Sequence, residues 1–151
     1  MSDYDPFFAE LEADAPEEWT PLYEQAPNLR KFVDGTAPRA KQSPYFGCQI
    51  RIRNSHVESS FVIYEPHRRN LVRAFKNVGL RYLPDLEAEY GSPLRLGVVE
   101  TETGADLSDV VAWSSSDRDL PALVEWTVSS QTRLRHAVHA TGFIELVRPF
   151  Q

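Results

Sequence analysis

The pattern of apolar and polar residues predicts an ordered series of strands and helices in the middle of the chain. Polar and apolar side chains alternate over residues 49–53, which is typical of a strand with one face in water. Residues 61–64 are continuously apolar and β-branched or aromatic, as expected of a strand buried on both faces. A proline follows, and apolar residues at helical spacing then predict a helix over residues 66–79 that ends at its glycine.

The remainder of the chain continues the alternation of helix and strand. Residues 83–90 predict a short helix, and residues 94–113 predict a hairpin whose turn lies at residues 101–106. Possible N-caps and a first-turn proline introduce a long helix over residues 121–141. Apolar residues 143–147 then predict a last strand, which the following proline stops.

These elements predict an α+β fold. From residue 57 to residue 148 their order is β-α-β-β-α-β, the order of the ferredoxin-like sandwich, in which two helices cover one face of an antiparallel sheet. Residues 49–53 would add an outer strand. The other sheet face needs a cover, and the chain's own N-terminal helices, a second subunit and a ligand are the three candidates. We therefore expect residues 47–151 to form one α+β domain.

Residues 1–46 differ from this domain and predict an acidic, helical N-terminal arm with a linker. Helix starts are expected at Asp5, Pro16 and Asn28, because each combines a capping residue or first-turn proline with apolar residues at helical spacing. Residues 35–46 contain prolines and small polar residues, which indicates a linker.

The arm also carries several large aromatic side chains, which are expected to be buried rather than exposed to water. Its large rings are Phe7, Phe8, Trp19, Tyr23 and Phe32. Two interpretations remain open. In the first, the helices fold back on their own sheet. In the second, they dock on a neighbouring copy and lay their acidic side chains beside its basic residues.

Charge is unevenly distributed along the chain. The net charge is −6, yet residues 47–82 carry about +5, whereas the segments before and after carry about −5 and −6. A single cysteine, Cys48, excludes an internal disulfide and a cysteine-rich metal site. The start of the chain lacks the pattern of a signal peptide, and no apolar run has the length of a membrane span. We therefore expect a soluble protein that acts in the cytoplasm or in a particle assembled there.

The basic segment of residues 47–82 is the strongest functional feature. Its candidate binding residues are Arg51, Arg53, Arg69, Arg73 and Lys76. Three interpretations are open: a contact surface for another protein, a solvated face, or a phosphate-binding surface on which Tyr45, Phe46 and Tyr64 stack against bases. The acidic remainder of the protein disfavours nucleic acid.

The histidines offer a further chemical possibility. His139-Ala140-Thr141 resembles one half of the paired His-x-Thr/Ser motif of the 2H phosphoesterases, in which two motifs face each other across a cleft and act on a phosphodiester. The best second half is His56-Val57-Glu58, where glutamate replaces the hydroxyl residue. His136 and His139 share a helix face, but no third metal ligand is marked, so neither a metal nor another cofactor is predicted.

The function predicted from the sequence is that of a non-enzymatic structural protein. It would form a homo-oligomer or join a larger complex, such as the tail or neck of a phage particle. The predicted interface residues are Phe7, Phe8, Trp19, Tyr23, Arg51, Arg53, Arg69, Arg73 and Lys76. The alternatives are a small nucleic-acid-binding or inhibitor protein that uses residues 47–82, and a phosphodiesterase-like enzyme that uses His56 and His139.

Overall fold

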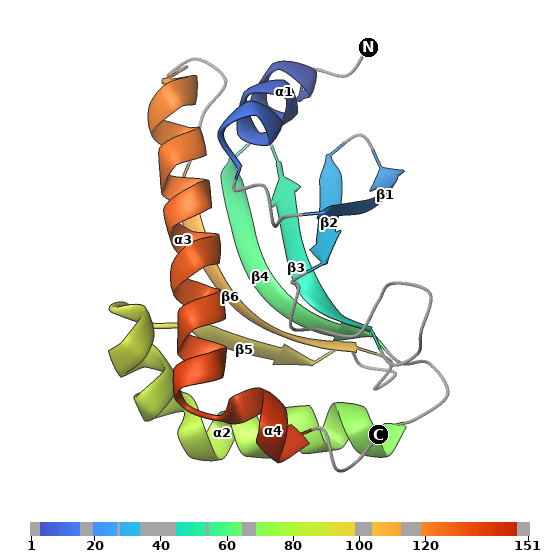
Figure 1. Cartoon of the computed structure of the whole chain (residues 1–151), viewed down its shortest axis with the longest axis vertical. Helices are drawn as coiled ribbons and strands as arrows, with labels where there is room; N and C mark the ends of the chain where they lie inside the picture. The colour runs from blue at the N-terminus through green and yellow to red at the C-terminus, as the bar shows by residue number, and fades with distance from the viewer. Residues whose placement is uncertain are drawn as a thin grey trace.

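The chain folds as an α+β protein, as predicted. The computed structural model describes residues 4–15, 20–26, 28–33, 45–53, 55–64, 69–98, 104–112 and 119–147. They form α1 (Asp5–Asp14), β1 (Thr20–Ala26), β2 (Leu29–Val33), β3 (Tyr45–Ile52), β4 (His56–Tyr64), α2 (Arg69–Tyr90), β5 (Arg95–Val98), β6 (Gly104–Ala112), α3 (Leu120–Ala140) and α4 (Phe143–Val147). Figure 1 shows these elements along the chain. None of the described helices is both long enough and apolar enough to cross a membrane.

The strands form one sheet in the order β1-β2-β3-β4-β6-β5, and every neighbouring pair is antiparallel. The predicted hairpin of residues 94–113 is confirmed as β5 and β6. The predicted strand of residues 49–53 is part of β3, but it lies inside the sheet because β2 pairs with its other side. The centre of the sheet is β4, which pairs with β3 and β6 along its whole length.

The hydrophobic core lies between one face of this sheet and the helices. Because side chains alternate along a strand, Val57, Phe61 and Ile63 of β4 all point to that face, and each is at most 1% exposed. The ring of Phe61 lies 6.4 Å from the ring of Phe75 on α2, which in turn contacts Phe143 of α4 at 4.9 Å. Strand and helix therefore share one apolar core.

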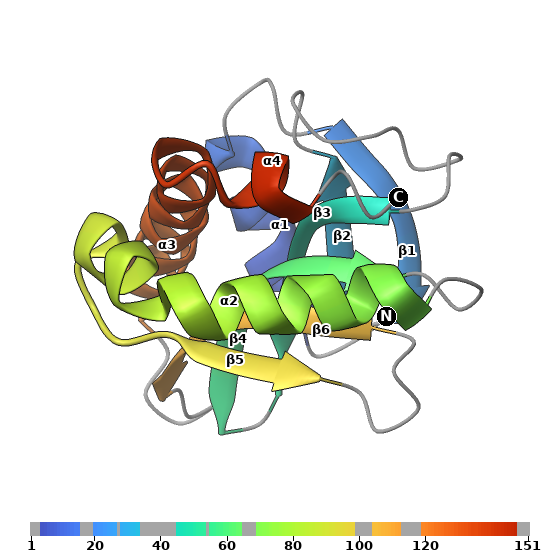
Figure 2. The ribbon, with the colours of Figure 1, turned by 90° about the horizontal axis from the view of Figure 1, so that it is seen from below.

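The helices of the described residues lie around this core. The helix α3 packs against β4, α1 packs against α3, and α2 packs against β5 and β6. Figure 2 shows α2 running beside the short helix α4. Asp119 caps α3, since its carboxylate accepts a hydrogen bond of 3.1 Å from the Ala122 amide.

The helix α2 is longer than predicted. Residues 66–79 and 83–90 were expected to form two helices, but one helix continues from Arg69 through Pro84 to Tyr90. Gly79 is not a helix end: a Cβ atom there would lie 3.0 Å from the side chain of Leu96, so glycine allows β5 to pack closely. The helix ends before Gly91, whose φ of 96° places it in the left-handed region.

The predicted strand at residues 143–147 is wrong, because these residues form the helix α4. Gly142, with φ of 72°, separates α4 from α3, and α4 turns Phe143, Ile144 and Val147 into the core at helical spacing. The complete ferredoxin-like order is therefore not confirmed. Beside β4, where that order requires its fourth strand, the chain places β3 instead.

The predicted helices after Pro16 and Asn28 are also wrong. Residues 20–26 and 29–33 form the strands β1 and β2, which pair across a short turn. Pairing of β2 with β3, and of β1 with β2, gives these residues a ladder of backbone hydrogen bonds, which local helical spacing does not predict. The first predicted helix is confirmed as α1. Thus the described part of residues 1–46 joins the same sheet and core. Of the predicted linker at residues 35–46, residues 35–44 lie outside the described residues, and residues 45 and 46 begin β3.

A polar contact inside the fold ties α2 and α3 to the sheet. The hydroxyl of Tyr90, at the end of α2, donates to the Asp109 carboxylate of β6 at 2.7 Å and lies 2.7 Å from the Ser130 hydroxyl of α3. The Arg133 guanidinium stacks over the Tyr90 ring at 4.3 Å and donates to the Tyr90 carbonyl at 3.0 Å. Burial raises the pKa of the Tyr90 hydroxyl well above its usual range, so it remains a donor.

We predict that Tyr90→Phe lowers the free energy of unfolding by about 1–2 kcal/mol, because it removes one hydroxyl that serves two elements. Urea unfolding measures this change. Tyr82→Phe is the matched control, since Tyr82 lies on the same helix outside this contact and its change is expected to be much smaller. Equal changes in the two variants would contradict the role assigned to the Tyr90 hydroxyl.

Candidate functional site

The second face of the sheet carries the strongest candidate site. The strand register places Arg51 of β3 opposite Glu58 of β4, and Ser60 of β4 opposite Ser108 of β6. These residues alternate with the core residues of the same strands and therefore point away from the helices. We call this surface the outer face and define it by the residues Arg51, Glu58, Ser60, Arg95, Asp106 and Ser108. Val62, also on this face, is buried but does not belong to the core cluster.

Charges of both signs are placed across the outer face. Arg51 lies on β3 and Arg95 on β5, while the acidic residues Glu58 and Asp106 lie on β4 and β6 between them. Asp106 stands opposite Gly97 of β5, where an added Cβ atom would lie only 2.5 Å from the Asp106 carboxylate oxygen. Glycine at this position therefore makes room for the Asp106 carboxylate.

Asp106 has an unusual electrostatic environment for a residue on a sheet face. Burial raises the pKa of its carboxyl group, and the nearby negative charge of Glu58 raises it further. Arg95, a hydrogen bond from Ser108, and Arg51 act in the opposite direction but do not cancel the increase. The carboxylate is thus partly removed from water and needs the arginines on either side of it.

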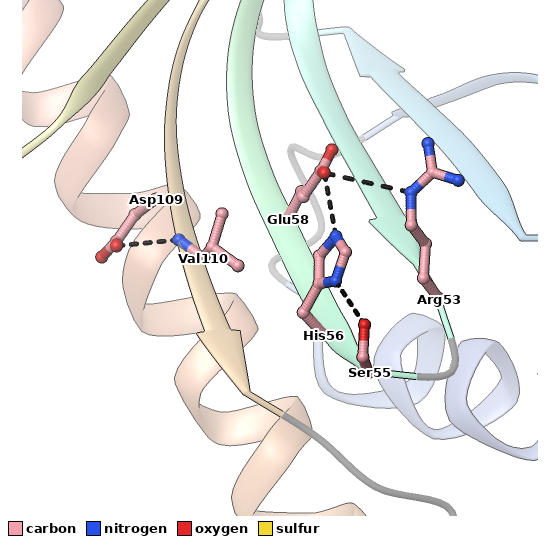
Figure 3. Close-up of polar contacts among 6 residues, drawn as sticks. All are labelled: Arg53, Ser55, His56, Glu58, Asp109 and Val110. Atoms are coloured by element: carbon pink, nitrogen blue, oxygen red, sulfur yellow. Dashed lines mark hydrogen bonds and ion pairs between the residues drawn. The ribbon is translucent and has the colours of Figure 1, made fainter.

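One end of the outer face carries a chain of hydrogen bonds around His56 (Figure 3). Its Nδ1 atom lies 2.9 Å from the Ser55 hydroxyl, and its Nε2 atom lies 3.0 Å from Oε1 of Glu58. The Nε atom of Arg53 lies 4.0 Å from the same oxygen. The hairpin between β3 and β4 holds these residues, since the Arg53 amide donates to the His56 carbonyl at 2.8 Å.

The two sheet faces are easily told apart in Figure 3. The side chains of His56 and Glu58 project from β4 on one side, whereas Asp109 of the neighbouring β6 projects on the other. Asp109 accepts a hydrogen bond of 2.8 Å from the Val110 amide and belongs to the Tyr90 contact in the helical layer. The hydrogen-bonded chain around His56 is therefore a surface feature of the outer face.

The predicted basic cluster does not form a single patch. Arg51 and Arg53 lie on the outer face beside Glu58, whereas Arg73 and Lys76 are exposed on α2, which packs against the opposite side of the sheet. The side chain of Arg69, the first residue of α2, lies outside the described part of the structure. Positive charge that is concentrated in the sequence is thus divided between two layers of the fold.

Two aromatic residues of the arm that were predicted to lie at an interface are found in the hydrophobic core. Phe7 and Phe8 are 1% and 2% exposed and belong to the core cluster of their own chain. Their rings contact each other edge to face at 5.1 Å, and the Arg30 guanidinium covers Phe8 at 4.1 Å. These rings thus pack in the core of their own chain, and their assignment to an interface stays a prediction. Tyr23 of β1 pairs with Lys31 of β2, and Trp19 lies outside the described residues.

His56 and His139 are not brought together. His56 is the first residue of β4, and His139 precedes the last residue of α3. In Figure 1, β4 and α3 run in the same direction, so the two histidines lie at opposite ends of these elements. The arrangement that the resemblance to 2H phosphoesterases implies, with two motifs facing each other, is therefore absent from this pair.

Asp106, Ser108 and Arg95 were missed by the sequence interpretation. Residues 101–106 were read as a turn, but β6 begins at Gly104, and the polar residues 106 and 108 alternate with the buried residues 105 and 107. That alternation was the available signal. Among the described residues no group of three or more histidine, cysteine or acidic side chains is placed to hold a metal ion. Comparisons with protein-family models, with curated proteins and with solved structures found no match to the chain.

We predict that Asp106→Asn stabilises the protein at neutral pH but not in acid. Because the folded state raises the pKa of Asp106, folding loses stability as the pH rises through the usual range of aspartate toward the raised value. Asparagine carries no charge to bury and escapes this loss. Urea unfolding at about pH 3 and about pH 7 measures the difference, which should grow with pH.

Glu125→Gln on the exposed side of α3 is the control, and its effect should be small at both values of pH. A variant Asp106→Asn that is less stable than the parent at neutral pH would show that pairing with the arginines outweighs burial.

Proposed function

We propose that this protein is an assembly protein, and that it associates with further copies of itself through the outer face of its sheet. The observation that supports the proposal is a set of two arginines and two acids, of which Arg51, Glu58 and Asp106 are half-buried and Arg95 is exposed, on a face against which none of the described helices packs. Such a face is self-complementary, because an arginine of one copy meets a carboxylate of the next.

The other surfaces of the sheet are less suited to self-association. The helices α1, α2, α3 and α4 and the core between them occupy the opposite face. The edge strand β1 carries Pro21 and two irregularities in its pairing with β2, and the edge strand β5 has only four residues. Proline, bulges and shortness are features that protect sheet edges from pairing with another chain. Within the described part of the chain, the outer face is the sheet surface against which no helix packs, and it is the one that we propose for a second copy.

Charge complementarity favours a second copy over nucleic acid as the occupant. A phosphate backbone requires several positive charges without acids among them. On the outer face, Arg51 stands directly opposite Glu58, and Arg95 acts on the buried Asp106. A surface of mixed sign repels a polyanion at Glu58 and Asp106, whereas a second copy offers both signs in return. The proposal concerns association itself, and a place in a phage particle remains a prediction from the sequence.

We predict that the protein forms a defined multimer at low salt. Reversing a charge on the outer face should weaken this association, and mixing two variants with opposite reversals should restore it. Arg51→Glu makes the outer face more acidic, and Glu58→Arg makes it more basic, so each variant alone should associate at least about tenfold more weakly. An equimolar mixture of the two variants should associate again, because an acidic face then meets a basic one. Light scattering at about 0.01 M and about 1 M salt measures the native mass.

Lys76→Glu provides a control with the same change of charge on the exposed side of α2, and it should leave the native mass unchanged. A parent protein that stays monomeric at low salt over a wide range of concentration would refute the proposal. A multimer that Arg51→Glu and Glu58→Arg leave intact would also refute it, since association would then use another surface.

A further inference from the structure

We infer that Ser55 is a nucleophile that accepts acyl groups from esters, activated by His56 and Glu58. The Ser55 side chain is exposed at the hairpin between β3 and β4, and its hydroxyl lies 2.9 Å from one ring nitrogen of His56. The other ring nitrogen lies 3.0 Å from the Glu58 carboxylate. Nucleophile, base and orienting carboxylate thus form a continuous hydrogen-bonded chain (Figure 3).

The carboxylate determines where the imidazole proton resides. An ionised Glu58 can only accept, so the Nε2 atom of a neutral His56 must carry the proton that it donates to Glu58. The Nδ1 atom then presents its lone pair, and the Ser55 hydroxyl donates to it. The geometry therefore prepares Nδ1 to remove the serine proton, which is the role that a histidine base has beside a catalytic serine.

The reaction follows from this arrangement. Ser55 Oγ attacks the carbonyl carbon of the ester while Nδ1 of His56 takes the hydroxyl proton. The tetrahedral intermediate then expels the alcohol or phenol, which takes this proton from Nδ1, and the acyl group remains on Ser55. A water molecule, deprotonated by the same nitrogen, releases the carboxylic acid and restores the serine.

Two features of the hairpin support this role. The backbone contact between Arg53 and His56 fixes the turn that carries Ser55. The Nε atom of the Arg53 guanidinium lies 4.0 Å from the same Glu58 oxygen that contacts His56, so this carboxylate is held between two side chains of the hairpin. The substrate class is an ester with an accessible carbonyl group, since Ser55 is exposed to water rather than enclosed. This activity shares Glu58 with the proposed self-association, but its test follows Ser55 and His56 and does not depend on the native mass.

The test compares two exposed serines of the same molecule. The full chain is treated with 4-nitrophenyl acetate and quenched in acid, and peptide mass spectrometry gives the acetylation rates of Ser55 and of Ser129 on α3. We expect Ser55 to react at least about tenfold faster, because general-base assistance contributes about 10²–10⁴-fold in favourable cases. His56→Gln should lower the rate of Ser55 to that of Ser129.

Glu58→Gln should also slow acetylation of Ser55, because the glutamine side chain no longer requires the His56 proton to lie on Nε2. Circular dichroism confirms that these surface variants remain folded. Equal rates at Ser55 and Ser129, or acetylation of Ser55 that His56→Gln leaves unchanged, would overturn the inference. Acetylation of the His56 ring without transfer to Ser55 would overturn it as well.

Discussion

The alternation of side chains along β4 is the constraint on which both the core and the candidate site depend. Val57 and Phe61 enter the core because the helices pack on their side of the strand, and His56, Glu58 and Ser60 consequently lie on the other side. A shift of one residue in the pairing would exchange the two sets. The long ladders with β3 and β6 on both sides of β4 therefore fix the position of the outer-face residues as firmly as they fix the core.

Hydrogen bonds inside the core also help to fix the position of the helices on the sheet. Ser59 points to the helical side, where its hydroxyl accepts a hydrogen bond of 2.9 Å from the side-chain amide of Gln131. The same amide group donates to the carbonyls of Ser60 and Gln49, which belong to two adjacent strands. Because buried polar groups require partners, α3 has one favourable position along the sheet. The Tyr90 contact positions α2 in the same way, so packing is directional as well as hydrophobic.

The sequence predicted the elements with strong local signals and failed where tertiary contacts decided the outcome. The periodicity of residues 121–141 and the hairpin of residues 94–113 were sufficient to identify α3, β5 and β6. Residues 20–26 and 29–33 have apolar spacing that suits a helix, but β2 pairs with β3 and β1 pairs with β2, which makes them strands. The helix α4 takes its form from packing beside α2. Of the candidate site, Arg51 and Arg53 were found by alternation in β3. The sequence did not predict the hydrogen-bonded chain around His56, because the roles of Ser55 and Glu58 depend on hydrogen bonds that only the folded structure shows.

The distribution of charge in the fold also could not be predicted from its distribution along the sequence. Residues 47–82 are strongly basic in the sequence, but a strand and a helix that are consecutive in the chain lie in different layers of the fold. The arginines of β3 are therefore neighbours of Glu58 and Asp106, which come from other strands, rather than of Arg73 and Lys76. Local neutrality follows, although the segment is basic and the protein as a whole is acidic. A neutral face costs less to remove from water than a face of one sign, since each charge keeps a partner. For this reason the folded arrangement favours contact with another protein surface of mixed charge over contact with a polyanion.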